Sequence, residues 1–154
     1  MLYKYSTRLN EDRIPFLVKE SSYPVDRRYS LDAPSKTHEV LRDVLRMQDM
    51  AEEHVFQVCL NAAMRPVGIF EIAKGGINAS IVDLRVPFRN CILLNATGYV
   101  LAHNHPSGDV TPSKWDIEVT KALTDAGKIM HIELLDHIIV GEDVYYSFLE
   151  SGMR

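Results

Sequence analysis

Residues 103–116 read HNHPSGDVTPSKWD, and this stretch predicts both the local fold and the chemistry of the chain. The apolar run Tyr99–Ala102 leads directly into it and predicts a short β-strand. Alternate side chains of a strand point to the same face. We therefore expect His103 and His105 to present two imidazoles to one side, at the point where the strand ends.

The second half of the same stretch predicts a turn followed by the start of a helix. Its prolines and glycine favour a loop that turns back, and Ser113 is expected to cap a helix whose first turn carries Asp116. A carboxylate is favoured at that position by the helix dipole. Two imidazoles and one carboxylate would then leave a fourth tetrahedral position to water, the pattern of catalytic rather than structural zinc sites. Iron, cobalt or nickel could occupy the same ligands.

The composition predicts one globular domain. The chain has 154 residues, of which 46% are hydrophobic and 25% charged. The formal net charge is −4 and no basic stripe is present, so the charge does not support nucleic-acid binding through phosphates. No apolar run approaches the roughly 18–20 residues needed to cross a bilayer, and the first residues lack a signal-peptide core. We therefore expect a cytoplasmic protein without a membrane partner; the oligomeric state is not predictable from the sequence.

The two cysteines do not predict a metal or redox site. Cys59 and Cys91 form no Cys-x-x-Cys pair, which leaves a Cys-based zinc site unsupported. Cys59 lies in a strand-like run and Cys91 in a helix-like one. Both are expected to be buried free thiols.

Hydrophobic periodicity and turn residues predict the other elements of the fold. The expected strands are Leu2–Thr7, Phe16–Lys19, Val55–Leu60, Pro66–Ile72, His131–Val140 and Val144–Leu149. The expected helices run from Ser35 to about Met50, over Val86–Leu94, and from Ser113 to a C-cap at Gly127. Val55–Leu60 and Pro66–Ile72 are expected to form a hairpin, ended by Gly75 and Gly76.

The spacing His-x-His-Pro, six residues, then Ser-x-x-Asp resembles the motif of the JAB/MPN (JAMM) metallopeptidases. It is filled by His103, His105, Pro106, Ser113 and Asp116. In that family the two histidines and the aspartate bind one zinc ion, which implies this role for His103, His105 and Asp116. The family serine hydrogen-bonds the water or the developing oxyanion, which implies a catalytic role for Ser113 beside its role as a helix cap.

A longer part of the chain resembles the RadC branch of this family. Residues 135–141 read LDHIIVG, and the likeness runs from about residue 36 to 150. It implies an α/β fold in which a single mixed β-sheet is flanked by helices, the MPN-like or cytidine-deaminase-like architecture. The predicted organisation is a strand and loop extension over 1–35 and a RadC-like JAB/MPN domain over 36–154. His137, within the LDHIIVG segment, is expected to be a hydrogen-bonded core histidine rather than a ligand.

The resemblance also implies a glutamate that acts as general base and acid. In RadC-like chains it lies in an Arg-Glu-His-Phe type segment, which matches residues 52–56 (EEHVF), so Glu53 is the expected base. Glu71 is the alternative, because it too lies near a predicted strand. In the implied reaction Glu53 takes a proton from the zinc-bound water and returns it to the leaving amine, while Ser113 supports the oxyanion.

Three functions are compatible with these features. The first is a zinc-dependent hydrolase of amide bonds, a peptidase or isopeptidase acting on a peptide or protein conjugate. The second is a DNA-repair-associated accessory or DNA-binding protein of the RadC type with little turnover. Longer RadC proteins usually carry an N-terminal helix-hairpin-helix region, which 35 residues are too few to form, so support for this second function is weak. The third is a structural zinc domain, which would unfold when zinc is chelated.

Overall fold

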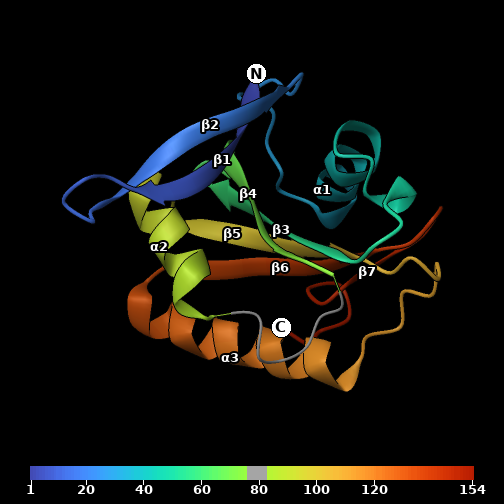
Figure 1. Cartoon of the computed structure of the whole chain (residues 1–154). Helices are drawn as coiled ribbons and strands as arrows, with labels where there is room; N and C mark the ends of the chain where they lie inside the picture. Colours follow the sequence, from blue (N-terminus) through green and yellow to red (C-terminus); the bar gives the residue numbers. More distant parts are fainter. Residues whose placement is uncertain (76–82) are drawn as a thin grey trace.

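A single mixed β-sheet forms the centre of the molecule (Figure 1). The computed structural model of the chain describes residues 1–75 and 83–154. Within these residues the sheet has seven strands in the order β2-β1-β4-β3-β5-β6-β7. The strands are β1 (Leu2–Leu9), β2 (Pro15–Tyr23), β3 (His54–Leu60), β4 (Pro66–Lys74), β5 (Gly98–Asn104), β6 (Glu133–Val140) and β7 (Tyr145–Ser147). Neighbouring strands are antiparallel except for the pairs β1–β4 and β5–β6, which are parallel.

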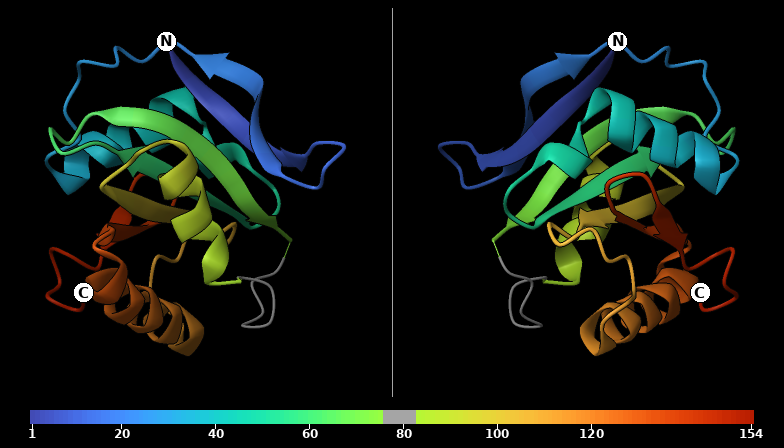
Figure 2. Two further views of the ribbon diagram at one scale, coloured as in Figure 1. Left: turned by 90° about the vertical axis from the view of Figure 1, so that its left-hand side faces the viewer. Right: turned by 90° about the vertical axis from the view of Figure 1, so that its right-hand side faces the viewer.

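Helices flank the sheet, as expected for the predicted α/β class, which is confirmed. The described helices are α1 (Pro34–Glu39), α2 (Arg85–Leu93) and α3 (Lys114–Met130). Strand alternation separates two apolar cores: Phe56 and Val58 of β3 face α1 and the turns that follow it, while Val55 of the same strand faces α2 and α3. The β1–β2 hairpin and α3 lie at opposite sides of the molecule (Figure 2).

The predicted strands are present, but two of them differ in length: β2 continues to Tyr23, beyond the predicted end at Lys19, and β7 covers only Tyr145–Ser147 of the predicted Val144–Leu149. Residues 1–23 contribute two full strands to the common sheet, because β1 pairs with both β2 and β4. Pro15 is the first residue of β2, where it interrupts no ladder. The predicted hairpin is the antiparallel pair β3–β4. The domain boundary at residue 35 stays a prediction.

The prediction of one helix from Ser35 to Met50 is wrong. Ala33 is the N-cap, α1 ends at Glu39, and a π-helical turn (Val40–Val44) and a 3-10 turn (Met47–Asp49) follow. A regular helix would place positions 45 and 47 about 200° apart, yet Leu45 and Met47 are 5% and 0% exposed. The chain therefore breaks at Arg46, with φ of 55°, and both side chains reach the core.

Gly127 is not the C-cap of α3. The helix continues to Met130 and ends at His131, whose φ is 53°. Gly127 is instead buried against the chain that follows the helix, where a Cβ would lie 2.6 Å from the carbonyl oxygen of Ile132. Its role is therefore close packing of α3 rather than termination. Gly75 follows β4 with φ of 85°, while Gly76 lies outside the described residues.

Cys59 and Cys91 are buried free thiols, as predicted, with their sulfur atoms 3.8 Å apart. Among the described residues, no helix has the length and apolar character required to span a bilayer.

Candidate metal centre

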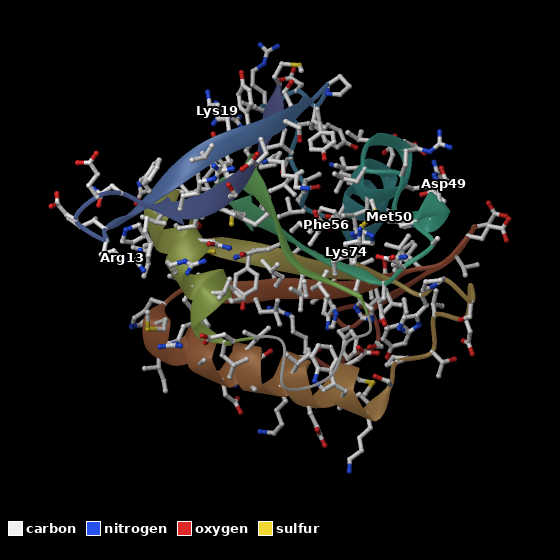
Figure 3. The ribbon with its side chains drawn as sticks, viewed as in Figure 1. Arg13, Lys19, Asp49, Met50, Phe56 and Lys74 are labelled. Atoms are coloured by element: carbon white, nitrogen blue, oxygen red, sulfur yellow. The ribbon has the colours of Figure 1, made fainter. Side chains whose placement is uncertain are left out.

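The two histidines of the 103–116 stretch meet at the carboxyl end of β5. His103 is the penultimate residue of that strand, and His105 continues its ladder through a hydrogen bond from its backbone N–H to the carbonyl of Val140 (3.1 Å). Their Nε2 atoms lie 3.0 Å apart, close to the roughly 3.3 Å expected between two nitrogens on one tetrahedral zinc. The expected convergence of the two imidazoles is therefore present. This end of the sheet is near the labels of Met50, Phe56 and Lys74 in Figure 3.

The start of α3 brings the carboxylate of Asp116 to the same point. Its Oδ1 is 3.2 Å from Nε2 of His103, and its Oδ2 is 3.7 Å from Nε2 of His105. A capping box fixes the position: Ser113 Oγ accepts from the Asp116 N–H (3.1 Å), and the Ser113 N–H donates to Asp116 Oδ2 (2.7 Å). Ser113 is thus the N-cap of α3, as predicted.

Asp116 is a carboxylate in the folded protein although its residue is only 1% exposed. Burial raises its pKa, but the hydrogen bond and charge of a protonated His103 ring, together with the hydrogen bond from the Ser113 N–H, hold the pKa well below its usual range. The site therefore offers a fixed negative charge beside two ring nitrogens.

Glu53 also lies close to the same two imidazoles. It lies immediately before β3, and its Oε1 is 3.9 Å from Nε2 of His103 and 3.7 Å from Nε2 of His105. Glu53, His103 and His105 form a group that could hold a metal ion, with ligand atoms within 4.8 Å of one another. Asp116 approaches His103 more closely than Glu53 does, and both carboxylates lie within 4 Å of the imidazole pair.

Glu71, the alternative base, is directed elsewhere. Its carboxylate binds Lys4 Nζ and His54 Nδ1, both at 2.6 Å. Of the two glutamates considered from the sequence, only Glu53 lies close to His103 and His105.

A buried hydrogen-bond chain orients the ring of His103. The Thr120 hydroxyl donates to the carbonyl of Asp116 (2.6 Å), so it can only accept from Nδ1–H of His137 (2.6 Å). Burial and the nearby His103 hold the pKa of His137 well below its usual value, so its ring is neutral and its Nε2 accepts. His103 Nδ1, 2.8 Å away, must then carry the hydrogen. In the neutral ring, the Nε2 of His103 then has a lone pair that points into the site. Without a metal ion, the same nitrogen can hold the proton that Asp116 Oδ1 accepts, 3.2 Å away.

His105 has the same protonation pattern by a shorter route. Its Nδ1 lies 2.6 Å from the carbonyl oxygen of Asp109, to which it can only donate, so in the neutral ring its Nε2 also has a lone pair directed at the site. Two lone pairs 3.0 Å apart repel each other unless a cation or proton lies between them. The residues present therefore fit a metal ion, and imidazole nitrogen with carboxylate oxygen is a ligand set that zinc accepts.

The site opens into a cavity of about 340 Å³ lined by Glu53, His105, Pro106, Ser107, Ser113 and Asp116. A larger cavity of about 670 Å³ lies between α3, the start of β6 and the C-terminal residues Met153 and Arg154. Of these two cavities, the smaller one is the candidate site, because His105, Glu53 and Asp116 line it.

Two residues that support the site were not identified from the sequence. Thr120 and Asn104 were not expected at the site, although the position of Asn104 between two histidines is a signal that could have drawn attention to it. His137 is fully buried and hydrogen-bonded, as expected, but its partner is His103 itself.

Comparison with known proteins gives a consistent result. The family model described as "RadC-like JAB domain" matches residues 31–153. A UPF0758 protein of Desulfitobacterium hafniense is 39% identical over 123 residues, which are 80% of this chain and 53% of the relative. A UPF0758 protein of Alkaliphilus metalliredigens is 40% identical over 125 residues, 81% of this chain and 53% of the relative. A UPF0758 protein of Symbiobacterium thermophilum is 38% identical over 136 residues, 88% of this chain and 57% of the relative. The chain thus spans about half the length of the curated relatives it matches.

Proposed function

The chain belongs to the RadC-like JAB domain family, and from this premise we propose that it is a zinc-dependent hydrolase of amide bonds, a peptidase or isopeptidase. The observation that carries the proposal is the orientation of the two imidazoles. His137 orients the ring of His103, and the carbonyl of Asp109 orients the ring of His105. The Nε2 atoms of both rings therefore point to one place beside the buried carboxylate of Asp116. An arrangement that brings lone pairs together is costly without a cation.

Three side chains would hold the ion: His103, His105 and Asp116. When bound, zinc supplies a Lewis acid that lowers the pKa of a water molecule and polarises a substrate carbonyl. The imidazoles are oriented before any ion arrives, because their Nδ1–H groups already have partners. The cavity lined by Pro106 and Ser107 gives a substrate access to this point.

Glu53 and Ser113 would perform the proton and charge transfers. The Glu53 carboxylate lies on the cavity wall within 4 Å of both Nε2 atoms, where it can take a proton from an attacking water and deliver it to the leaving amine. Ser113 Oγ accepts from a backbone N–H, so its own hydroxyl hydrogen can donate to a developing oxyanion in the same cavity.

The test is cleavage of fluorogenic peptide and ubiquitin-like conjugate libraries by the zinc-loaded protein. We expect turnover that Glu53→Gln lowers by roughly 10²- to 10⁴-fold, the usual contribution of a general acid–base group. The matched variant is Glu71→Gln, which removes the other glutamate considered as a base and is expected to retain most of the turnover. Equal losses in the two variants, or turnover that survives in Glu53→Gln, would contradict the assignment of Glu53.

Removal of zinc separates a catalytic site from a structural one. We expect a chelator to stop turnover while the circular dichroism spectrum stays that of the folded protein, because the two apolar cores are formed by side chains that do not touch the ion. Unfolding on chelation would instead support a structural zinc domain. The DNA-binding alternative stays a prediction, to be tested by salt-dependent binding to single-stranded or forked DNA.

A further inference from the structure

Asn104, the residue between the two histidines, contacts the segment that carries Glu53. Because neighbouring strand residues point to opposite faces, its side chain lies on the α1 side of the sheet, away from the rings of His103 and His105. It is 1% exposed. Its Oδ1 accepts from the backbone N–H of His54 (2.7 Å), and its Nδ2 donates to the carbonyls of Glu52 (2.9 Å) and Met50 (3.3 Å).

These three hydrogen bonds surround Glu53 along the chain. Regular pairing between β3 and β5 ends at Val55 opposite His103, so Glu53 lies beyond the last ladder pair. The side chain of Asn104 supplies hydrogen bonds where the β3–β5 ladder has ended. It binds the carbonyl of Glu52, just before Glu53, and the N–H of His54, just after it. The carbonyl of Glu53 itself accepts from the N–H of Gly75 (2.9 Å). The backbone that presents this carboxylate is therefore fixed on both sides.

The geometry points to Asn104 as a positioning residue: we propose that it sets the Glu53 carboxylate relative to the two imidazoles. This inference rests on the proposed hydrolase and names a residue through which Glu53 is held. The backbone of Asn104 belongs to β5, the strand that leads to both imidazoles. Its side chain hydrogen-bonds to the backbone on both sides of Glu53. One residue therefore links the base to the ligands.

The chemistry of the contact explains why an asparagine stands here. The contact needs one acceptor and two donors on a short, planar group, which the asparagine amide supplies. Aspartate has no donor for the carbonyls of Glu52 and Met50, and serine or threonine has only one hydrogen. The exact position of the Glu53 carboxylate matters, because a misplacement of about 1 Å in a catalytic group can lower the rate roughly 10²-fold.

The experiment compares Asn104→Ala with Asn61→Ala in the full chain loaded with cobalt(II). The side chain of Asn61 also hydrogen-bonds to the backbone, accepting from the N–H groups of Ala63 and Arg65, but at the opposite end of β3. The readouts are cobalt(II) affinity and the pH midpoint of the visible absorption of the bound ion. Glu53→Gln and the double variant Asn104→Ala/Glu53→Gln complete the set.

We expect Asn104→Ala to keep cobalt(II) affinity within about tenfold, less than the 10- to 100-fold loss typical when a partner of a ligand is removed. The pH midpoint should shift in the direction produced by Glu53→Gln, and Asn104→Ala should add nothing further in the Glu53→Gln background. Asn61→Ala should leave the midpoint at the wild-type value. On a cleaved peptide, Asn104→Ala should lower kcat by about 10²-fold with little change in KM.

An unchanged midpoint in Asn104→Ala overturns the proposal, and so does a shift that adds in full to that of Glu53→Gln. If wild type cleaves no substrate while the cobalt(II) midpoints behave as expected, the hydrolase fails and the positioning role stands. Should Asn104→Ala not fold, Asn104→Ser replaces it and amide exchange in wild type gives a second measure. Slow exchange of the His54 N–H supports the role, and exchange as fast as in an open loop contradicts it.

Discussion

The two halves of the site are built in different ways. His103, His105 and Asp116 come from one stretch of chain in which a strand end, a loop and a capped helix start bring the side chains together. Glu53 comes from a separate segment, before β3, whose position depends on Asn104 and on the N–H of Gly75. The first half follows from local sequence spacing, whereas the second follows from hydrogen bonds between residues far apart in the chain.

This difference predicts separable failures. A change in the first half should remove the metal ion, because the ligands themselves are lost or turned. A change in the second half should leave the ion bound and displace only the carboxylate that faces it.

The largest effect is expected from Asp116→Asn. The asparagine oxygen can still accept from the Ser113 N–H, and Ser113 can still cap α3, so the helix start should be kept. Metal-free stability should nevertheless fall by more than about 1 kcal/mol near neutral pH, because the folded protein loses a carboxylate whose pKa it holds low. Zinc affinity should fall by more than about 10²-fold, the upper end of the loss seen for partners of ligands, because a charged ligand is lost. Competition with a chromophoric chelator measures the affinity, and thermal melting measures the stability.

Ser113→Ala is the matched control within the same capping box. It removes the acceptor for the Asp116 N–H and should lower stability by about 1 kcal/mol, while zinc affinity stays within about tenfold. If Asp116→Asn binds zinc as tightly as wild type does, Asp116 is a helix cap alone and the first half lacks its third ligand.

The next effect concerns the chain that orients His103. Thr120→Val keeps the shape of a fully buried side chain but removes the acceptor of the His137 Nδ1–H. His137 can then change tautomer and donate from Nε2, which would force a hydrogen onto the Nε2 of His103. We expect zinc affinity to fall roughly 10- to 100-fold, as measured by chelator competition.

Thr124→Val is the control one turn further along α3. Thr124 also donates its hydroxyl hydrogen to a helix carbonyl, that of Thr120 (2.8 Å). Thr124→Val should change the free energy of unfolding by the same amount as Thr120→Val, within about 1 kcal/mol. It should leave zinc affinity unchanged. Equal zinc affinities in the two variants would show that His103 keeps its orientation without this chain.

The sequence predicts most of the sheet and the first half of the site because both depend on local patterns. Apolar runs bounded by turn residues identify the strands, and the capping serine identifies the start of α3. The segment after α1 is not predictable in this way. Its apolar residues suit a helix, but Leu45 and Met47 reach one core only because Arg46 takes a left-handed conformation, a choice made by tertiary packing.

The second half of the site shows the same limit. Glu53 and Glu71 are equivalent by local pattern, since each lies near a strand, and only the family resemblance favoured Glu53. What distinguishes them in the structure is long-range: Lys4 and His54 bind Glu71, and Asn104 holds the backbone around Glu53. No spacing along the chain encodes a contact such as that of Lys4 with Glu71, which joins β1 to β4.

The smallest effect is expected at Glu71, which belongs to neither half. Burial raises the pKa of Glu71, but the hydrogen bonds and charges of Lys4 and His54 outweigh it and hold the pKa below the ordinary value. A carboxyl group whose pKa is lower in the folded protein stabilises it above the unfolded pKa, about 4.3, and loses that contribution as the pH falls through the folded pKa. The side chains of Lys4 and Glu71 are 25% and 24% exposed, so solvent screening limits the gain to about 1 kcal/mol.

Denaturant unfolding of wild type and Glu71→Gln between pH 3 and 7 measures this contribution. The difference in free energy of unfolding should be largest near neutral pH and should shrink toward zero as the pH falls below about 4. Lys4→Met should show the same dependence, because it removes the partner of the same carboxylate. Zinc affinity should be unchanged in both variants. If Glu71→Gln weakened zinc binding as Asp116→Asn is expected to, the metal centre would extend beyond the strand end and helix start, and the division of the site into two independently built halves would be wrong.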